Sequence, residues 1–176
     1  MKKCLEAVQA RLSKIESIAT RRKQIEGERG ELQTRANDLT KQIASGNAKA
    51  VTDQAIARAR LEVSIPEEFS KCQAEHNATI AELRGEFLNL GKAVGAAYAE
   101  KTKKTQAEVE EFLARHMDAH PDRDDLRDKI TDLSRDVIKH AQAHQSCHPG
   151  LLSGEMSESD LLRKCKNTLY LIKDLI

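Results

Sequence analysis

The fold is decided by the stretch Phe69–Ala97, which reads FSKCQAEHNATIAELRGEFLNLGKAVGAA. Its apolar and weakly polar residues recur every three or four positions, at Phe69, Cys72, His76, Ile80, Leu83, Phe87, Leu90, Val94 and Ala97. Alternating steps of three and four place residues on one face of an α-helix. We therefore expect one helix here, with a narrow stripe of the kind that one helix offers another in a coiled coil.

The stripe fades around Lys101 to Thr105 and returns at Val109, Phe112 and His116. We expect a helix from Pro66 to about Met117, which at 1.5 Å per residue would be roughly 75 Å long. Before it, residues 64–67 read Ser-Ile-Pro-Glu, an S-x-x-E capping box with proline in the first turn. Because no glycine accompanies this box, we expect a kink or a restart there rather than a reversal of the chain.

Four further helices follow from the same periodicity. One runs from about Lys2 to Ala44 and stops at Ser45-Gly46-Asn47, where glycine supplies the left-handed cap. A short one covers about Ala48 to Val63. Another follows the break at residues 120–122, and the last is capped by residues 157–160, Ser-Glu-Ser-Asp.

The composition also favours an all-α fold. The chain has no Trp, three Phe and two Tyr, so its core must be built from aliphatic residues. Eight Gly and three Pro in 176 residues are too few for a turn-rich β fold. The four cysteines form no CxxC pair, which is typical of reduced thiols. Neither a signal peptide nor a membrane-spanning run is recognisable, and we expect a cytoplasmic protein.

The architecture follows from folding the chain back on itself at two predicted turns. A reversal at Gly46 and another at Pro121 give two antiparallel hairpins that share the long central helix and meet near Gly91 and Gly95. The expected fold is an elongated antiparallel helical bundle of coiled-coil hairpins over residues 1–148. Residues 149–176 would form a loop and an amphipathic C-terminal helix that packs on the bundle or on a partner.

The C-terminal helix has the widest apolar face in the chain. Leu162, Cys165, Leu169, Ile172 and Ile176 follow heptad steps, and Leu161, Leu171 and Leu175 widen the face beyond one seam. A face of this width has to be covered. We expect five of these residues to bind a partner: Leu161, Leu162, Leu169, Ile172 and Ile176.

The histidines are the main candidates for chemistry. Residues 140–150, HAQAHQSCHPG, place three histidines at four-residue spacing, so that their side chains share a helix face. His144, Cys147 and His148, with Cys4 as a fourth ligand, could hold zinc. The alternative, which we favour, is a helix end at which histidines satisfy terminal carbonyl groups.

Catalytic patterns are missing from the sequence. It contains no E-x-x-H, which argues against a di-iron carboxylate bundle, and no HExxH, P-loop or GxGxxG motif. We therefore expect a protein that is not an enzyme and that needs no cofactor.

Charge is unevenly distributed although the net charge is only +1. Residues 1–49 are basic and include Arg21, Arg22 and Lys23, whereas residues 50–100 are acidic. A basic helix can bind the phosphates of nucleic acid, but no aromatic residues lie among these basic ones for base stacking. We favour a solvated basic face that neighbours the acidic middle segment, and consider nucleic acid an unlikely partner.

Taken together, these patterns favour a helical scaffold or adaptor that acts through protein contacts and self-associates as a homo-oligomer. The first alternative is a metal- or redox-responsive helical regulator that uses the His/Cys cluster. The second alternative is a nucleic-acid-binding protein that uses the basic first helix.

Overall fold

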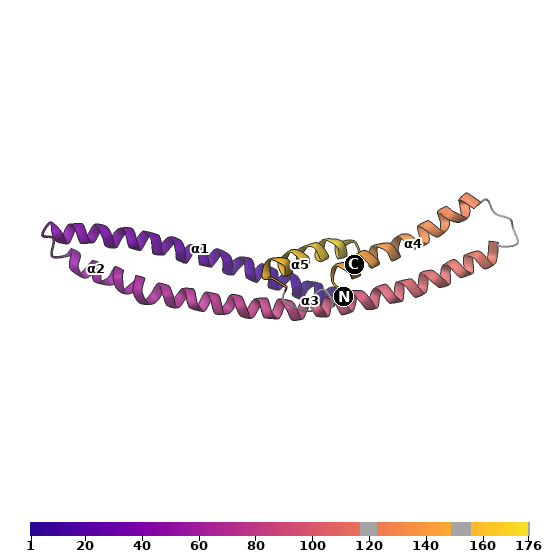
Figure 1. The fold of residues 1–176 in the computed structure, drawn as a ribbon, viewed down its shortest axis with the longest axis horizontal. Coiled ribbons are helices and arrows are strands. Elements are labelled where there is room, and N and C mark those ends of the chain that lie inside the picture. The colour runs from indigo at the N-terminus through magenta and orange to yellow at the C-terminus, as the bar shows by residue number, and fades with distance from the viewer. Residues whose placement is uncertain (117–122, 149–155, 176) are drawn as a thin grey trace. The chain divides into compact units, whose positions relative to one another are not determined.

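The computed structural model describes residues 1–116, 123–148 and 156–175, and it confirms the all-α fold class. The helices, in chain order, are α1 (Lys2–Ala44), α2 (Ala50–Ala59), the π-helical η1 (Arg60–Ser64), α3 (Ile65–His116), α4 (Arg123–Ser146), α5 (Glu158–Ile172) and the 3₁₀-helical η4 (Lys173–Leu175) (Figure 1). The predicted long central helix is present, because α2, η1 and α3 follow one another without a break.

The chain divides into two compact units, which we describe separately. Unit 1 contains residues 1–10 and 83–176, and unit 2 contains residues 11–82. The helices α1 and α3 each contribute to both units. The C-terminal helix α5 belongs to unit 1.

Unit 2 is a hairpin whose turn confirms the predicted reversal at Gly46. Gly46 has φ of 91°, a left-handed conformation that favours glycine. The Gly46 amide donates to the Ile43 carbonyl, and the Asn47 amide donates to the Gln42 carbonyl, both at 3.0 Å. These two bonds form a Schellman motif, which ends α1 and returns the chain along it.

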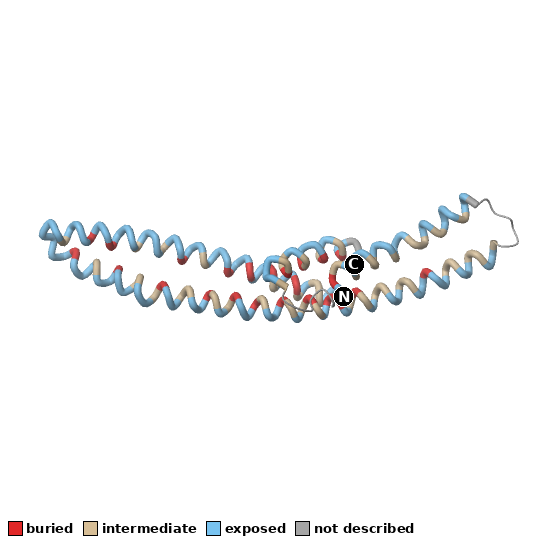
Figure 2. The backbone as a smooth tube through the Cα atoms, viewed as in Figure 1, coloured by how far each residue is buried: buried red, intermediate tan, exposed pale blue. Residues whose placement is uncertain are grey.

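The core of unit 2 is a single seam between α1 and the continuous helix formed by α2, η1 and the start of α3. Its centre is a cluster of four buried residues, Ile18, Ile25, Ile65 and Cys72, against which Leu32 and Phe69 pack half-buried. Figure 2 shows buried positions recurring at intervals along the helices. The predicted stripes of the first and central helices therefore face one another in this unit.

The capping box predicted at residues 64–67 is replaced by a π-helical turn. The amide of Ile65 donates to the carbonyl of Arg60, a bond to the fifth preceding residue. Pro66 has no amide hydrogen and its ring would crowd the carbonyl of Glu62 in a regular α-helix. The wider π turn accommodates the proline, so the helix neither restarts nor reverses.

Unit 1 has a more completely buried core, which we call the hub. It is formed by residues 83–98 of α3, residues 143–147 at the end of α4, and residues 158–172 of α5. On α3, four apolar side chains are almost fully buried: Leu83, Phe87, Leu90 and Val94. Gly91 lies so close to the backbone carbonyl of Cys147 that a Cβ atom would overlap it. A Cβ atom at Gly95 would lie 3.2 Å from Nε2 of His144. The predicted close approach at these two glycines is confirmed.

Helix α5 begins at the predicted cap and packs into the hub. The Ser157 hydroxyl accepts a hydrogen bond from the Asp160 amide at 3.2 Å, which satisfies a free donor of the first turn. The Thr168 hydroxyl donates to the Ser146 carbonyl at 3.3 Å and lies 3.0 Å from its hydroxyl. These contacts join α5 to the end of α4.

Candidate interaction surfaces

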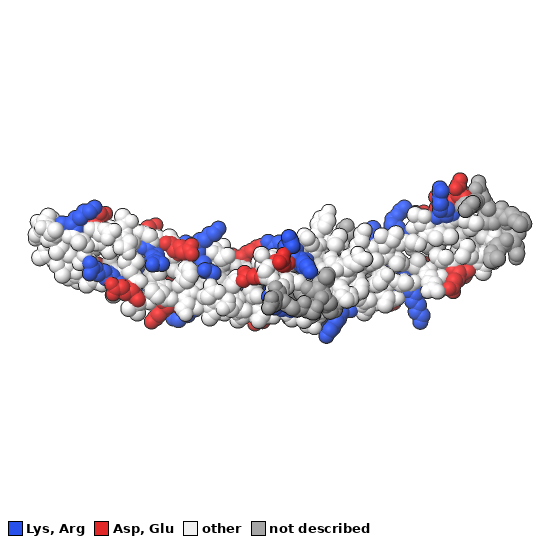
Figure 3. Space-filling model, in the orientation of Figure 1, with Lys and Arg blue, Asp and Glu red and all other residues white. Residues whose placement is uncertain are grey.

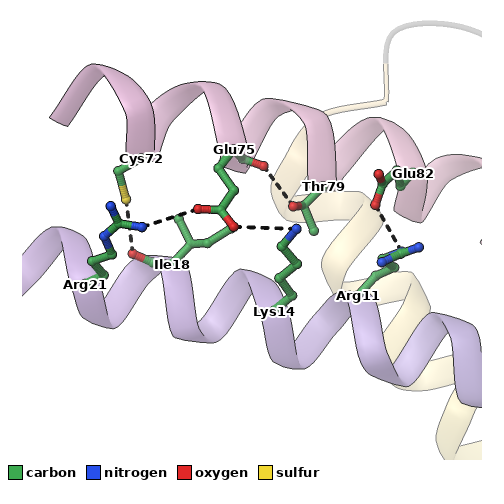
Figure 4. Close-up of polar contacts among 8 residues, drawn as sticks. All are labelled: Arg11, Lys14, Ile18, Arg21, Cys72, Glu75, Thr79 and Glu82. Atoms are coloured by element: carbon green, nitrogen blue, oxygen red, sulfur yellow. Dashed lines mark hydrogen bonds and ion pairs between the residues drawn. The ribbon is translucent and has the colours of Figure 1, made fainter. Parts of the chain in front are cut away.

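Three basic residues of α1 have acidic partners within unit 2. Arg11 lies 3.1 Å from Glu82, while Lys14 and Arg21 reach the two carboxylate oxygens of Glu75 at 3.5 and 3.4 Å (Figure 4). Because these pairs are exposed, each stabilises the hairpin by no more than about 1 kcal/mol. They confirm that the basic face of the first helix neighbours the acidic middle segment.

The other two residues predicted to bind nucleic acid differ in their surroundings. The guanidinium of Arg22 lies over the ring of Phe69, 4.9 Å from its centroid, in a cation–π contact. Lys23 is exposed. Thus Arg21 and Arg22 are already engaged within unit 2, and a phosphate would have to compete with Glu75 and with Phe69. Nucleic-acid binding stays a prediction.

Two further ion pairs in unit 2 involve Arg60 of the π-helical segment. Nε of Arg60 donates to Oε1 of Glu28 at 2.5 Å, and its guanidinium also lies 3.6 Å from Glu68. The hydrogen bond from Arg60 lowers the pKa of the Glu28 carboxyl below its ordinary value. Arg60 therefore links η1 both to α1 and to the first turn of α3.

The rings of His144 and His148 lie in contact, but no third metal ligand lies beside them among the described residues. The His144 ring stacks on Tyr98 with centroids 5.5 Å apart, and the His148 ring meets His144 edge-on at 5.3 Å. The His144 carbonyl accepts the Cys147 amide at 3.2 Å, as expected near a helix end. Among the residues that the structure describes, no group of three or more His, Cys, Asp or Glu side chains could hold a metal ion.

The Cys147 thiol is directed into the hub. Its Sγ donates to the Ala143 carbonyl at 3.1 Å, and the side chain is fully buried. Burial raises the pKa of this thiol from 9.0 to about 11, which disfavours the thiolate that a metal would need. Cys4 is half-buried on α1. The zinc hypothesis stays a prediction that would require this part of the hub to rearrange.

The predicted partner-binding face of α5 is turned partly inward. Leu161 and Ile172 are fully buried within the chain, while Leu162 and Leu169 are half-buried, and Ile176 lies outside the described residues. The buried seam runs through Leu161, Cys165, Thr168 and Ile172. Spacings of four and three connect these residues. The heptad steps predict Leu162 and Leu169 at the places that Leu161 and the polar Thr168 occupy. Two of the five predicted residues are thus buried within the chain, and partner binding through this face stays a prediction.

Two grooves that we did not predict lie along the hairpins. In unit 2, a groove of about 710 Å³ runs beside the π-helical turn, with Ile25, Leu61, Ile65 and Phe69 among its apolar lining. In unit 1, a groove of about 380 Å³ lies between α3 and α4, lined by residues such as Val109, Ile130 and Val137. Periodicity alone could not locate these grooves, since it does not show how completely one helix covers the next.

Comparison with known protein families, with curated proteins and with solved structures finds no match to this chain. Across the described parts of the chain, none of the helices combines the length and the apolar character that crossing a bilayer requires.

Proposed function

We propose that this chain is a non-enzymatic helical scaffold or adaptor that works in the cytoplasm through protein–protein contacts, including contacts between its own copies. The observation that carries the proposal is incomplete burial of apolar surface along the hairpins. Five large apolar or aromatic side chains lie exposed on the described helices: Val51, Ile56, Val63, Ile138 and Tyr170. Single exposed apolar residues are ordinary, but here they accompany open grooves with apolar linings.

The partner that this surface favours is another protein. Apolar grooves between antiparallel helices are suited to receive a further helix, in the manner of helix-in-groove recognition. On the face drawn in Figure 3, positive and negative side chains are interspersed, without the broad positive stripe that binds nucleic acid. A cytoplasmic setting is supported by the four cysteines, all of which are free thiols and three of which are buried.

The test is a tagged pull-down from a lysate of the source cells, with and without nuclease, combined with sedimentation analysis of the purified chain. We expect self-association and a protein that is retained after nuclease treatment. Recovery that disappears with nuclease would favour the basic first helix as a nucleic-acid site. A monomeric chain that retains no protein would contradict the proposal.

Deleting residues 157–176 is not a clean test of this function. The deletion would remove Leu161, Cys165 and Ile172 from the hub and uncover the apolar residues beneath them. Loss of binding would then report loss of folding. Substitutions at exposed positions such as Ile56 and Ile138 are the better probes.

A further inference from the structure

The middle of the unit 2 hairpin contains a level at which neither helix buries a residue. Within residues 11–82, all of which the structure describes, no residue of α1 between Ile25 and Ala36 is buried. On the opposite helix, none is buried between Ala57 and Ile65. We call this part of the hairpin the middle level; it comprises residues 26–35 and 58–64. Sparse burial is typical of the parts of a fold that open or deform most easily.

Two glycines weaken α1 at the middle level. Gly27 and Gly30 lie in the interior of this long helix. Neither serves a close approach of helices, because no atom of the described residues lies within 4 Å of a Cβ atom placed at either position. Relative to alanine, each glycine lowers the equilibrium constant for helix formation by a factor of about four to five.

The opposite helix is irregular at the same level. It contains the π-helical turn η1, and Pro66 follows the last residue of η1 by two positions. Bends in long helices occur at proline, at glycine and at π-helical turns, because each of these weakens the regular ladder of hydrogen bonds. The hairpin thus gathers all three kinds of feature at or beside its middle level.

An ion pair sets these features opposite one another. Glu28, which lies between the two glycines in the sequence, accepts a hydrogen bond of 2.5 Å from Nε of Arg60, the first residue of η1. The same guanidinium lies 3.6 Å from Glu68 at the start of α3. Because all three side chains are exposed to more than a third, this contact holds the two helices together only weakly.

Open space flanks the middle level. Besides the groove of about 710 Å³ described above, a hollow of about 820 Å³ is lined by Gly27 and Gly30, and another of about 330 Å³ is lined by Leu61 and Glu62. Close-packed interiors resist bending, because side chains would have to be displaced. At this level the helices can bend into space that no side chain fills.

We propose that the hairpin of unit 2 contains a hinge at its middle level, with the bond between Glu28 and Arg60 favouring the form seen in the structure. The tip, residues 36–57, then moves as one body against the base, residues 11–25 and 65–82. A bend of about 20° would displace the turn at Gly46 by roughly 7 Å, since α1 extends about 21 Å beyond Gly30. The hinge is independent of the proposed function, because it requires no partner.

The first test measures bending by NMR residual dipolar couplings in the full chain. Couplings from residues 36–44 and from residues 11–25 report the order of two segments of the same helix. We expect the order of the tip to be lower by roughly 10–20%, as bends of about 20–30° would produce. Equal order of the two segments in the wild-type chain overturns the hinge.

A double variant tests whether the glycines permit the bend. Gly27→Ala with Gly30→Ala should raise the order of the tip to that of the base. Gly85→Ala is the matched control, because Gly85 is an exposed helical glycine of unit 1 whose Cβ position is equally free. It should leave the order of the tip unchanged. A tip that stays equally mobile in the double variant overturns the role of the glycines.

The second test separates a hinge from local fraying of α1 by amide hydrogen exchange. The double glycine variant should slow exchange at the middle level by about 10- to 30-fold in α1 and also in residues 58–64 of the opposite helix. Amides of residues 18–25 are the internal reference for global unfolding. A slowing that is confined to α1 would mean that the two helices do not bend together and would overturn the hinge.

The ion pair is tested by the same measurement. Glu28→Gln should speed exchange at the middle level of both helices by about 2- to 5-fold, since it removes the charge that Arg60 contacts. Glu31→Gln, which changes an exposed carboxylate of the same helix, is the control and should have no effect. Equal effects of the two variants would overturn the role of the pair. All of these measurements use the purified chain, so their failure leaves the adaptor proposal standing.

Discussion

The hub and the adjoining arm, which contains residues 99–116 of α3 and 124–140 of α4, are both built from these two helices, yet only the hub buries its apolar residues. In the hub, Leu83, Phe87, Leu90 and Val94 are almost completely inaccessible, and α5 adds a third layer. In the arm, the same two helices leave Val109, Phe112, Ile130 and Val137 half-exposed. The apolar stripe that runs through the hub fades around Lys101 to Thr105 and returns at Val109 in the arm. The two regions also differ in the presence of a further helix and of Gly91, which lets α4 approach closely.

The largest effect should come from truncating a phenylalanine in the hub. Phe87→Ala should lower the free energy of unfolding by about 3–5 kcal/mol, because Phe87 is 1% exposed and its removal leaves a cavity. Phe112→Ala in the half-buried arm should cost only about 1 kcal/mol. Urea unfolding followed by circular dichroism measures both. Equal losses would show that the arm is as well covered as the hub, as it would be if a partner were already bound.

Substituting the glycine at the hub crossing should have the next largest effect. Gly91→Ala places a methyl group against the Cys147 carbonyl and should destabilise the chain by about 1–3 kcal/mol through overpacking. Gly85→Ala is its control, since nothing lies within 4 Å of a Cβ atom there. In a helix interior this change should stabilise by about 0.5–1 kcal/mol. The unfolding midpoint should therefore fall for Gly91→Ala and rise for Gly85→Ala.

The hub thiols should make stability depend on alkaline pH. Burial raises the pKa of Cys147 to about 11 and that of Cys165 to about 12, so the folded chain holds these protons more tightly than the unfolded chain does. Their contribution is fully present below about pH 9 and is lost as pH rises toward 11 and 12. The melting temperature should decline across this range of pH. Cys147→Ser and Cys165→Ser should each make that decline smaller. Alkylation at neutral pH should modify the half-buried Cys4 first.

The smallest effect is expected from the ion pair of the arm. The hydrogen bond and the charge of Lys101 lower the pKa of the Asp136 carboxyl. Lys101→Met should therefore raise this pKa toward its ordinary value, as an NMR titration of the carboxyl would measure. The ion pair stabilises the folded chain at pH values above the ordinary pKa of an aspartate carboxyl. This stabilisation is lost as pH falls through the lowered pKa of Asp136. A pKa that does not move would mean that the two helices of the arm are not joined at this point.

Much of the fold follows from periodicity and turn chemistry. Steps of three and four located every long helix, Gly46 marked the reversal, and the pair Gly91 and Gly95 marked the close approach. These features are encoded locally, by a spacing or by a residue type with one conformational role. The wide apolar face of α5 was recognised for the same reason.

The interaction surfaces were less predictable, because they depend on which neighbour covers each helix. Thr168 reads as polar, yet it lies in the buried seam of α5 and is hydrogen-bonded to Ser146. Arg21 and Arg22 read as a nucleic-acid patch, although Glu75 and Phe69 from a distant part of the sequence contact them. No sequence motif marks the groove of the arm, because it arises where α3 and α4 cover each other's apolar residues incompletely.

The π turn of unit 2 also changes the spacing of the buried positions. Ala50, Ala57, Ile65, Cys72 and Thr79 are buried along α2 and α3 at one recurring position of the repeat, while His76 is buried between the last two at a second position. Every interval is seven residues except that from Ala57 to Ile65, which is eight and contains η1. This interval thus contains one residue more than a heptad, and the wide turn accommodates it without moving the seam. A chain that lacks one residue of the segment 60–64 should recover an uninterrupted seven-residue repeat, with Pro66 as the only remaining irregularity.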